Sequence, residues 1–219
     1  VLHPQTTLLC LENTHNHAGG TCLSLDQTKA LADTARAHGL KIHLDGARIF
    51  NSAVAQGESV ADLTAEADSV TVCLTKGLGC PVGAVCIGSR EFIGEARRWR
   101  QASGGGMRQA GVIAAAGIVA LDTMVDRLAE DHANARLLAT LLAEAGLVLD
   151  CPPEEVETNI IFATIPADLM EADEFVSRWA EEGVMVNGAK NRRIRLITHH
   201  NISSADVEAA AVAARRVLG

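Results

Sequence analysis

Short apolar runs alternate with longer segments of helical pattern through the first half of the chain. Between the first two runs, the segment from Ser24 to His38 predicts a helix, with Ser24 and Asp26 as suitable caps and Gly39 at its end. The predicted strands cover residues 8–12, 41–45, 69–74 and 82–87. Continuous apolar strands separated by helices are typical of a sheet covered on both faces, so the pattern predicts a largely parallel α/β core.

The second half has a different pattern. Residues 107–145 are rich in Ala and Leu and contain no Pro, which predicts one long helix or two abutting helices that end at Gly146. Strands are then predicted at 159–165, near Val184 and at 193–198, and helices at 171–182 and from Ser203 or Ser204 to Val217. We therefore predict two domains, residues 1–128 and 129–219, with the boundary inside the long helix. The second is a small α+β domain.

Composition narrows the functional classes. The chain has 219 residues, of which 48% are hydrophobic, and a net charge of -8, so it can bury a sizeable core but has no general attraction for nucleic acid or an anionic membrane. It has no apolar run of the about 20 residues that span a membrane. Its six cysteines include no Cys-x-x-Cys pair, which favours reduced, buried thiols in a cytoplasmic protein. Because the chain starts at Val1 rather than Met, we expect it to be N-terminally incomplete.

Polar residues follow two of the predicted strands, where α/β folds place their binding sites. Asp45 ends one strand, with Arg48 one helical turn later, and Lys76 follows another. A lysine can bind the aldehyde of pyridoxal phosphate, and a carboxylate that faces the ring nitrogen keeps the ring protonated and electron-withdrawing. Alone, Asp45 before a glycine is more often a turn, and Lys76 before a glycine is more often a solvated loop residue.

Other motifs give weaker indications. Three glycines at 104–106 precede a predicted helix and fit either an anion-binding nest or a flexible connection. The segment around Lys76 lacks the upstream glycine of a phosphate-binding P-loop. The histidine pairs at 15 and 17 and at 199 and 200 lack the spacing of a zinc hydrolase, so no metal site is predicted.

Taken together, the motifs resemble those of the low-specificity threonine aldolases, which are fold-type-I pyridoxal phosphate enzymes. The resemblance covers almost the whole chain, with the blocks in family order. The matching blocks are Leu11–Asn16, His43–Asn51, Cys73–Gly79, Pro81–Gly83, Gly104–Gln109 and Arg195–His199. The resemblance implies a fold-type-I, transferase-like α/β protein, with the C-terminal part of the large cofactor-binding domain in residues 1–128 and the small domain in 129–219.

The resemblance also implies which residues bind the cofactor. Lys76 would be the catalytic residue and would attach pyridoxal phosphate covalently, and Asp45 would pair with the ring nitrogen. Arg48 would reach the 3-oxygen of the ring. Arg108 would serve the cofactor pocket.

For the substrate, the resemblance implies a 3-hydroxy amino acid whose carboxylate is held by Arg48 and by the planar fork of Arg195. His15 and Asn16 would be further pocket contacts. The implied reaction is retro-aldol cleavage of L-threonine or L-allo-threonine to glycine and acetaldehyde, in a cytoplasmic homodimer or homotetramer. Alternatives are another fold-type-I lyase that catalyses β-elimination, or a non-catalytic fragment of the aldolase.

Some family features have no match. The family extends beyond Val1, and that stretch carries the Ser/Gly/Thr loop around the phosphate and a histidine that stacks on the ring. A family histidine before the Leu11–Asn16 block would fall near His3, but His3 is shifted by one position. Gln101 stands where the family often has a basic residue. The resemblance therefore accounts for the lysine and its ring-nitrogen partner, and not for a phosphate cradle.

Overall fold

The computed structural model describes residues 5–219, so His3 lies outside the described residues. Two compact units make up the chain. Unit 1 contains the described residues up to His15 and residues 22–126, and unit 2 contains Asn16–Thr21 and Arg127–Gly219. The short segment Asn16–Thr21 therefore belongs to a different unit from the residues on either side of it.

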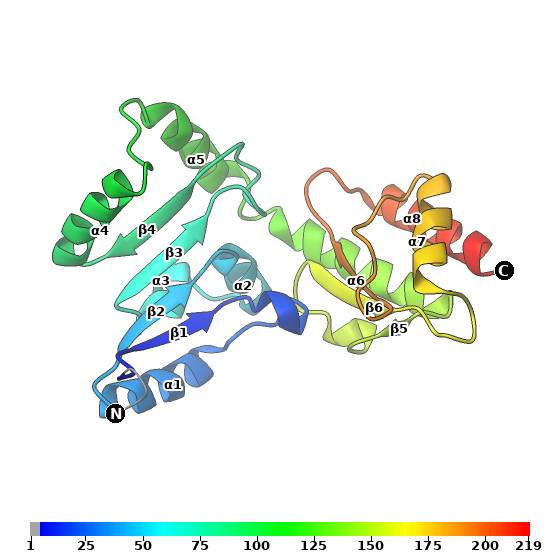
Figure 1. The fold of residues 1–219 in the computed structure, drawn as a ribbon, viewed down its shortest axis with the longest axis horizontal. Helices are drawn as coiled ribbons and strands as arrows, with labels where there is room; N and C mark the ends of the chain where they lie inside the picture. Colours follow the sequence, from blue (N-terminus) through cyan, green and yellow to red (C-terminus); the bar gives the residue numbers. More distant parts are fainter. Residues whose placement is uncertain (1–4) are drawn as a thin grey trace. The chain divides into compact units, whose positions relative to one another are not determined.

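A four-stranded sheet forms the centre of unit 1, and its strands lie side by side in Figure 1. The strands are β1 (Leu8–Glu12), β2 (Lys41–Asp45), β3 (Ser69–Cys73) and β4 (Ala84–Gly88), in the order β1-β2-β3-β4. The first three are parallel, and β4 runs antiparallel to β3. The predicted α/β class, the mostly parallel sheet and the four strands are confirmed.

Three helices of unit 1 begin at a serine cap. Ser24 forms a capping box with Gln27 at the start of α1, and Gly39, with a φ of +69°, follows its end. Ser59 and Ser89 accept backbone hydrogen bonds at the starts of α3 and α4. The helices are α1 (Leu25–Ala37), α2 (Ile49–Gln56), α3 (Val60–Thr64), α4 (Arg90–Ala102) and α5 (Gly111–Thr123). Only α1 and the region of α5 were predicted from the sequence.

The two faces of this sheet differ in polarity. On one face, Leu44 and Val70 pack against the fully buried Ile49 of α2 and Leu63 of α3. The opposite face carries small and polar side chains at alternate positions, among them Cys10, His43, Ser69, Thr71 and Cys73. The expectation of strands that are apolar on both faces is therefore wrong, because apolar residues alternate with polar ones along β2 and β3.

A three-stranded antiparallel sheet and three helices form unit 2. The strands are β5 (Val148–Leu149), β6 (Ile160–Thr164) and β7 (Arg193–Ile197), and the helices are α6 (Leu128–Glu144), α7 (Ala172–Glu181) and α8 (Ser204–Leu218). Two short 3-10 helices, η1 (Asn16–Ala18) and η2 (Pro153–Glu155), complete the unit. Phe175 and Trp179 of α7 are fully buried with their ring centroids 5.1 Å apart, and they lie at the centre of the core.

Three further expectations are settled by the structure. Residues 107–145 form two helices, α5 and α6, and not one. No strand forms at Val184, because its N–H donates to the carbonyl of Trp179 at 2.9 Å and closes the end of α7. Of the six cysteines, which are all free thiols, only Cys80 is buried, while Cys10 and Cys86 are exposed. Within residues 5–219, no helix combines the length and hydropathy that a membrane span requires.

Candidate active site

Lys76 lies in a tight turn after β3. Leu74 and Leu78 are buried on either side of it, whereas Thr75 and Lys76 are exposed. The turn is closed by two backbone hydrogen bonds of 2.9 Å, from Gly79 N–H to the Lys76 carbonyl and from Cys80 N–H to the Leu74 carbonyl. The buried leucines anchor the turn, so the Lys76 amine projects from a defined position at the end of the strand.

Asp45 ends the neighbouring parallel strand and pairs in register with Thr71 of β3. Its exposed carboxylate accepts a 3.0 Å hydrogen bond from the Ala47 N–H through Oδ1. Gly46 donates to the Thr71 carbonyl at 2.8 Å, and a Cβ on Gly46 would lie 3.2 Å from that oxygen. Because a side chain at position 46 would press on β3, the glycine allows the chain to turn there and carry Arg48 to the start of α2.

The end of β1 adds more polar groups at this edge of the sheet. Glu12 pairs in register with Asp45, and its Oε2 lies 3.5 Å from Nε2 of His15. Asn13 is buried, donates its N–H to the Asp45 carbonyl at 3.0 Å, and exchanges side-chain hydrogen bonds with the backbone of Leu23. The Thr14 hydroxyl is buried and makes no hydrogen bond within the described part of the chain. The carboxyl ends of three adjacent parallel strands therefore gather an amine, carboxylates, an imidazole and a hydroxyl.

The charge of Lys76 acts on the thiol of Cys73. Burial alone would raise the pKa of Cys73. Hydrogen bonds from Thr75, whose Oγ1 lies 3.2 Å from the sulfur, and the positive charge of Lys76 outweigh burial and leave the pKa of Cys73 below its ordinary value. The thiol of Cys73 thus reports the hydrogen bonds of Thr75 and the nearby charge of Lys76 at the end of β3.

The glycine-rich segment, residues 104–106, follows a helix and does not directly precede one. Gly104, with a φ of +78°, follows the C-terminus of α4, and its N–H donates to the Gln101 carbonyl. α5 begins only at Gly111. The expectation of glycines at a helix N-terminus is wrong, because the helix they adjoin is α4, which ends before them. Arg108 is exposed in the connection between α4 and α5, and no contact places it beside Asp45 or Lys76.

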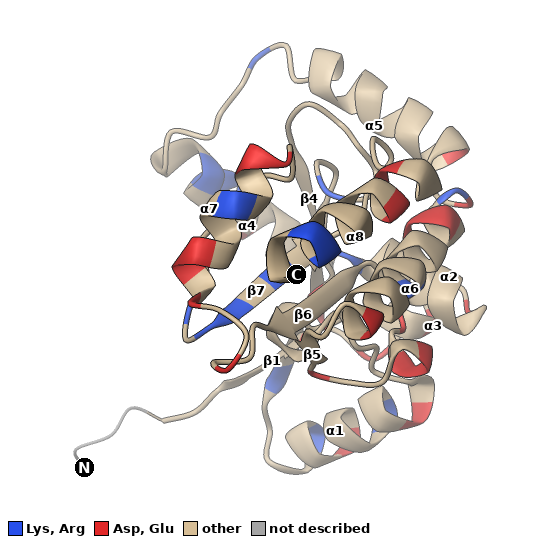
Figure 2. Ribbon diagram, turned by 90° about the vertical axis from the view of Figure 1, so that its right-hand side faces the viewer, with Lys and Arg blue, Asp and Glu red and all other residues tan. Residues whose placement is uncertain are grey.

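In unit 2, the predicted substrate arginine lies on β7, a strand marked by blue segments in Figure 2. Nη1 of the exposed Arg195 donates to Oδ1 of Asn16 at 3.0 Å. Arg195 also lines a cavity of about 770 Å³ formed by β7, the segment after α7 and the start of α8. Arg193, on the same strand, covers the ring of Phe162 at 3.5 Å and pairs with Asp150. The structure therefore brings Arg195 and Asn16 together in unit 2, and Asp45, His15 and Lys76 to one sheet edge in unit 1.

Comparisons with known proteins show the family to which the chain belongs. The family model described as beta-eliminating lyase matches residues 1–167. The chain belongs to the beta-eliminating lyase family. It is 44% identical to low-specificity L-threonine aldolase 1 of Arabidopsis thaliana over 94% of this chain and 57% of that protein. It is 42% identical to the low specificity L-threonine aldolase of Escherichia coli K12 over 91% of this chain and 56% of that protein.

Solved structures show the same fold. A threonine aldolase of Leishmania major superimposes with a TM-score of 0.74 at 18% identity, over 97% of this chain and 59% of that one. The fold is that of the fold-type-I pyridoxal phosphate enzymes, and the beta-eliminating lyase family uses this cofactor. The chain spans less than three-fifths of the length of these two curated aldolases. No cluster of three or more potential metal ligands occurs among the described residues.

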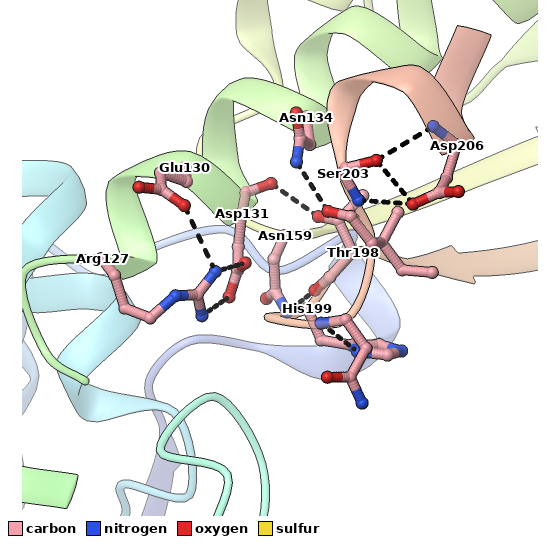
Figure 3. Close-up of polar contacts among 11 residues, drawn as sticks. Arg127, Glu130, Asp131, Asn134, Asn159, Thr198, His199, Ser203 and Asp206 are labelled. Atoms are coloured by element: carbon pink, nitrogen blue, oxygen red, sulfur yellow. Dashed lines mark hydrogen bonds and ion pairs between the residues drawn. The ribbon is translucent and has the colours of Figure 1, made fainter.

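Unit 2, the small unit, contains a buried polar network, which Figure 3 shows. The sequence patterns did not reveal this network. Asp131 is fully buried, and both its oxygens accept hydrogen bonds from Arg127, at 2.7 and 3.3 Å. Its backbone carbonyl accepts from Thr198 Oγ1 at 2.6 Å, and Asn159 Nδ2 donates to the Thr198 carbonyl at 2.9 Å. The network ties the residue after β7 to the start of α6. The spacing of Arg127 and Asp131, four residues apart, was its only signal in the sequence.

His132 makes the stability of the small unit depend on pH. Its side chain is buried, and that burial lowers its pKa to about 4, with Arg136 also lowering it and Asp131 opposing. A histidine in the unfolded chain has a pKa of about 6.5. As pH falls from 6.5 to 4, the unfolded state therefore binds a proton that the folded state does not bind, and the folded state loses stability. We expect the free energy of unfolding to drop by about 2–3 kcal/mol more in the wild type than in His132→Gln between pH 7.5 and 4.5. Urea unfolding at both pH values measures this difference. The exposed His200→Gln should behave as the wild type; equal pH dependence in all three proteins would contradict the assignment.

Proposed function

We propose that the protein cleaves 3-hydroxy amino acids such as L-threonine and L-allo-threonine to glycine and an aldehyde, with pyridoxal phosphate as its cofactor. One observation carries the proposal: Asp45 and Lys76 follow adjacent parallel strands, at the edge where α/β folds bind their ligands. The printed names of the Arabidopsis and Escherichia coli relatives support the choice of reaction.

The groups at this edge fit the chemistry of the cofactor. An amine can bind its aldehyde, a carboxylate can pair with its ring nitrogen, and the buried hydroxyl of Thr14, which follows β1, retains hydrogen-bonding capacity. When bound, pyridoxal phosphate supplies an electron sink that stabilises the carbanion left after the Cα–Cβ bond breaks. We assign covalent attachment to Lys76, ring-nitrogen pairing to Asp45, and further cofactor contacts to Arg48 and Arg108.

The remaining proposed roles concern the substrate. Arg195 and Arg48 bind its carboxylate, because a guanidinium presents paired N–H donors to the two oxygens. We propose His15 and Asn16 as further substrate contacts. Lys76 Nζ would return a proton to Cα, and the same amine would take back the cofactor aldehyde from the amino group of the glycine product. The contacts to the substrate carboxylate would fix the orientation in which the substrate is held, and the carboxylate of Asp45 would pair with the ring nitrogen of the cofactor.

A product assay distinguishes this function from β-elimination, which the name of the family model also describes. The complete gene product with pyridoxal phosphate is incubated separately with L-threonine, L-allo-threonine and L-serine. The proposal predicts acetaldehyde and glycine in equal amounts from both threonine isomers. Pyruvate and ammonia from serine, without acetaldehyde from threonine, would instead identify a β-eliminating enzyme.

Replacing Asp45 tests its proposed role without changing the size of the side chain. Asp45→Asn removes the negative charge beside the ring nitrogen, so we expect kcat for threonine cleavage to fall about 100-fold, the typical loss for one electrostatic contact to a developing charge. The absorbance of the Lys76-bound cofactor should remain. Asp33→Asn, at an exposed position of α1, is the matched control and should keep wild-type kcat. A kcat for Asp45→Asn within threefold of the control would refute the role.

We further propose a homodimer or homotetramer in the cytoplasm. α5 is apolar around most of its circumference, yet Val112, Ile118 and Val119 are 75%, 62% and 60% exposed. Apolar side chains at that density commonly mark protein interfaces. Six free thiols suit a reducing compartment. Light scattering on the complete gene product tests the assembly; a monomeric mass would contradict it.

A further inference from the structure

The segment Asn16–Thr21, here called the strap, belongs to unit 2, although the residues before and after it in sequence belong to unit 1. It consists of the short helix η1 followed by Gly19 and Gly20, whose φ angles are +80° and +75°. Only glycine adopts two successive positive φ angles at little cost, so the sequence of the strap suits this path.

One end of the strap is fixed to the start of β6. The hydroxyl of Thr158, a fully buried residue, donates to the Gly20 carbonyl at 2.6 Å. A Cβ on Gly20 would lie 2.3 Å from that hydroxyl and 3.3 Å from the Cβ of Ile160. The strap backbone therefore lies directly against β6, and no larger residue fits at position 20.

The other end of the strap reaches β7. Asn16 Oδ1 accepts the 3.0 Å hydrogen bond from Arg195 Nη1. Ile160, against which Gly20 lies, pairs in register with Ile197, and Phe162 pairs with Arg195. The two attachment points are therefore two residues apart along the β6–β7 ladder. The strap is therefore attached to the small sheet near both of its ends.

The chemistry of this contact suits an arginine that must still bind an anion. A guanidinium has five N–H donors, and Asn16 occupies one of them. Because the asparagine amide is neutral, it orients the guanidinium and leaves its positive charge for a carboxylate. We propose that Asn16 is a positioning residue, which holds Arg195 in the orientation that receives the substrate carboxylate. This inference rests on the proposed function and adds to it how the carboxylate contact is oriented.

The test uses two substitutions of different kinds in the complete gene product. Asn16→Ala removes the acceptor, so KM for L-threonine should rise about 5- to 10-fold while kcat stays within about twofold. Asn16→Asp keeps the shape but forms an ion pair with Arg195 that competes with the substrate, so its KM should rise more than that of Asn16→Ala. His17→Ala, at the next position of η1, is the control and should leave both constants unchanged.

A double substitution separates positioning from a general structural effect. In an Arg195→Ala background, Asn16→Ala should add no further increase in KM, because the group that it orients is gone. The inference is overturned if the two effects multiply, if Asn16→Asp matches the wild type, or if KM is unchanged in an active enzyme. A wild-type protein that cleaves neither threonine isomer would overturn the proposed function first, and the inference with it.

Discussion

Lys76→Ala should abolish both cofactor attachment and threonine cleavage. Lys76 is held by a closed turn after β3, at the same sheet edge as Asp45, and its amine is exposed. No other group can replace an amine that both binds the cofactor covalently and carries protons. We expect a fall in kcat/KM of at least about 1,000-fold, within the range lost with an essential acid–base group. The visible absorbance of the protein-bound cofactor should vanish at the same time, and a spectrophotometric titration with pyridoxal phosphate measures it.

Two further lysine variants sharpen this test. Lys76→Arg keeps the positive charge but cannot form the covalent bond, so it should be as inactive as Lys76→Ala. Lys29→Ala removes an exposed lysine of α1 and should keep wild-type activity and absorbance. An active Lys76→Arg protein would show that Lys76 supplies only charge.

Arg127→Ala should strongly destabilise the small unit. Asp131 has 0% exposure, and Arg127 donates to both of its oxygens. Without Arg127, a buried carboxylate loses its partner, which typically costs about 3–5 kcal/mol. We expect the free energy of unfolding, measured with urea at pH 7.5, to fall by that amount.

The matched control is an exposed ion pair of the same unit. Arg215 lies 3.1 Å from Glu144, with both side chains about half exposed, so Arg215→Ala should change stability by less than about 1 kcal/mol. The double variant Arg127→Met with Asp131→Leu should recover most of the loss, because no uncompensated charge stays buried. If Arg127→Ala and Arg215→Ala were equally mild, the buried network would not hold this unit together.

The elements that could be predicted were those whose signals are local. Ser24 and Gly39 delimit α1, and Ser203 caps α8 through a capping box with Asp206, as the sequence indicated. α2 and α3 were missed, because short helices beside strands lack a long apolar repeat, and α4 was missed although its apolar positions have helical spacing. The glycines at 104–106 were assigned to the wrong helix because α4, which buries none of its residues, had not been recognised before them.

For the candidate site, too, some features could be predicted from the sequence and others could not. Asp45 and Lys76 could be paired from sequence because both follow apolar strands, and parallel strands bring such ends to one edge. The contact between Asn16 and Arg195 joins residues far apart in the chain, and it depends on the path of the strap past Thr158. Likewise, the link between Thr198 and Asp131 forms only once β7 packs beside α6. Long-range side-chain contacts of this kind leave no periodicity in a single sequence.

The most direct test of the account is to locate the cofactor on the chain. The complete gene product is incubated with pyridoxal phosphate, reduced with borohydride, digested and analysed by mass spectrometry. The printed sequence contains four lysines, Lys29, Lys41, Lys76 and Lys190, so the attachment site within it can be assigned without ambiguity. The account predicts the pyridoxyl group on the peptide that contains Lys76. Attachment to any other lysine, or no attachment to the active protein, would contradict it.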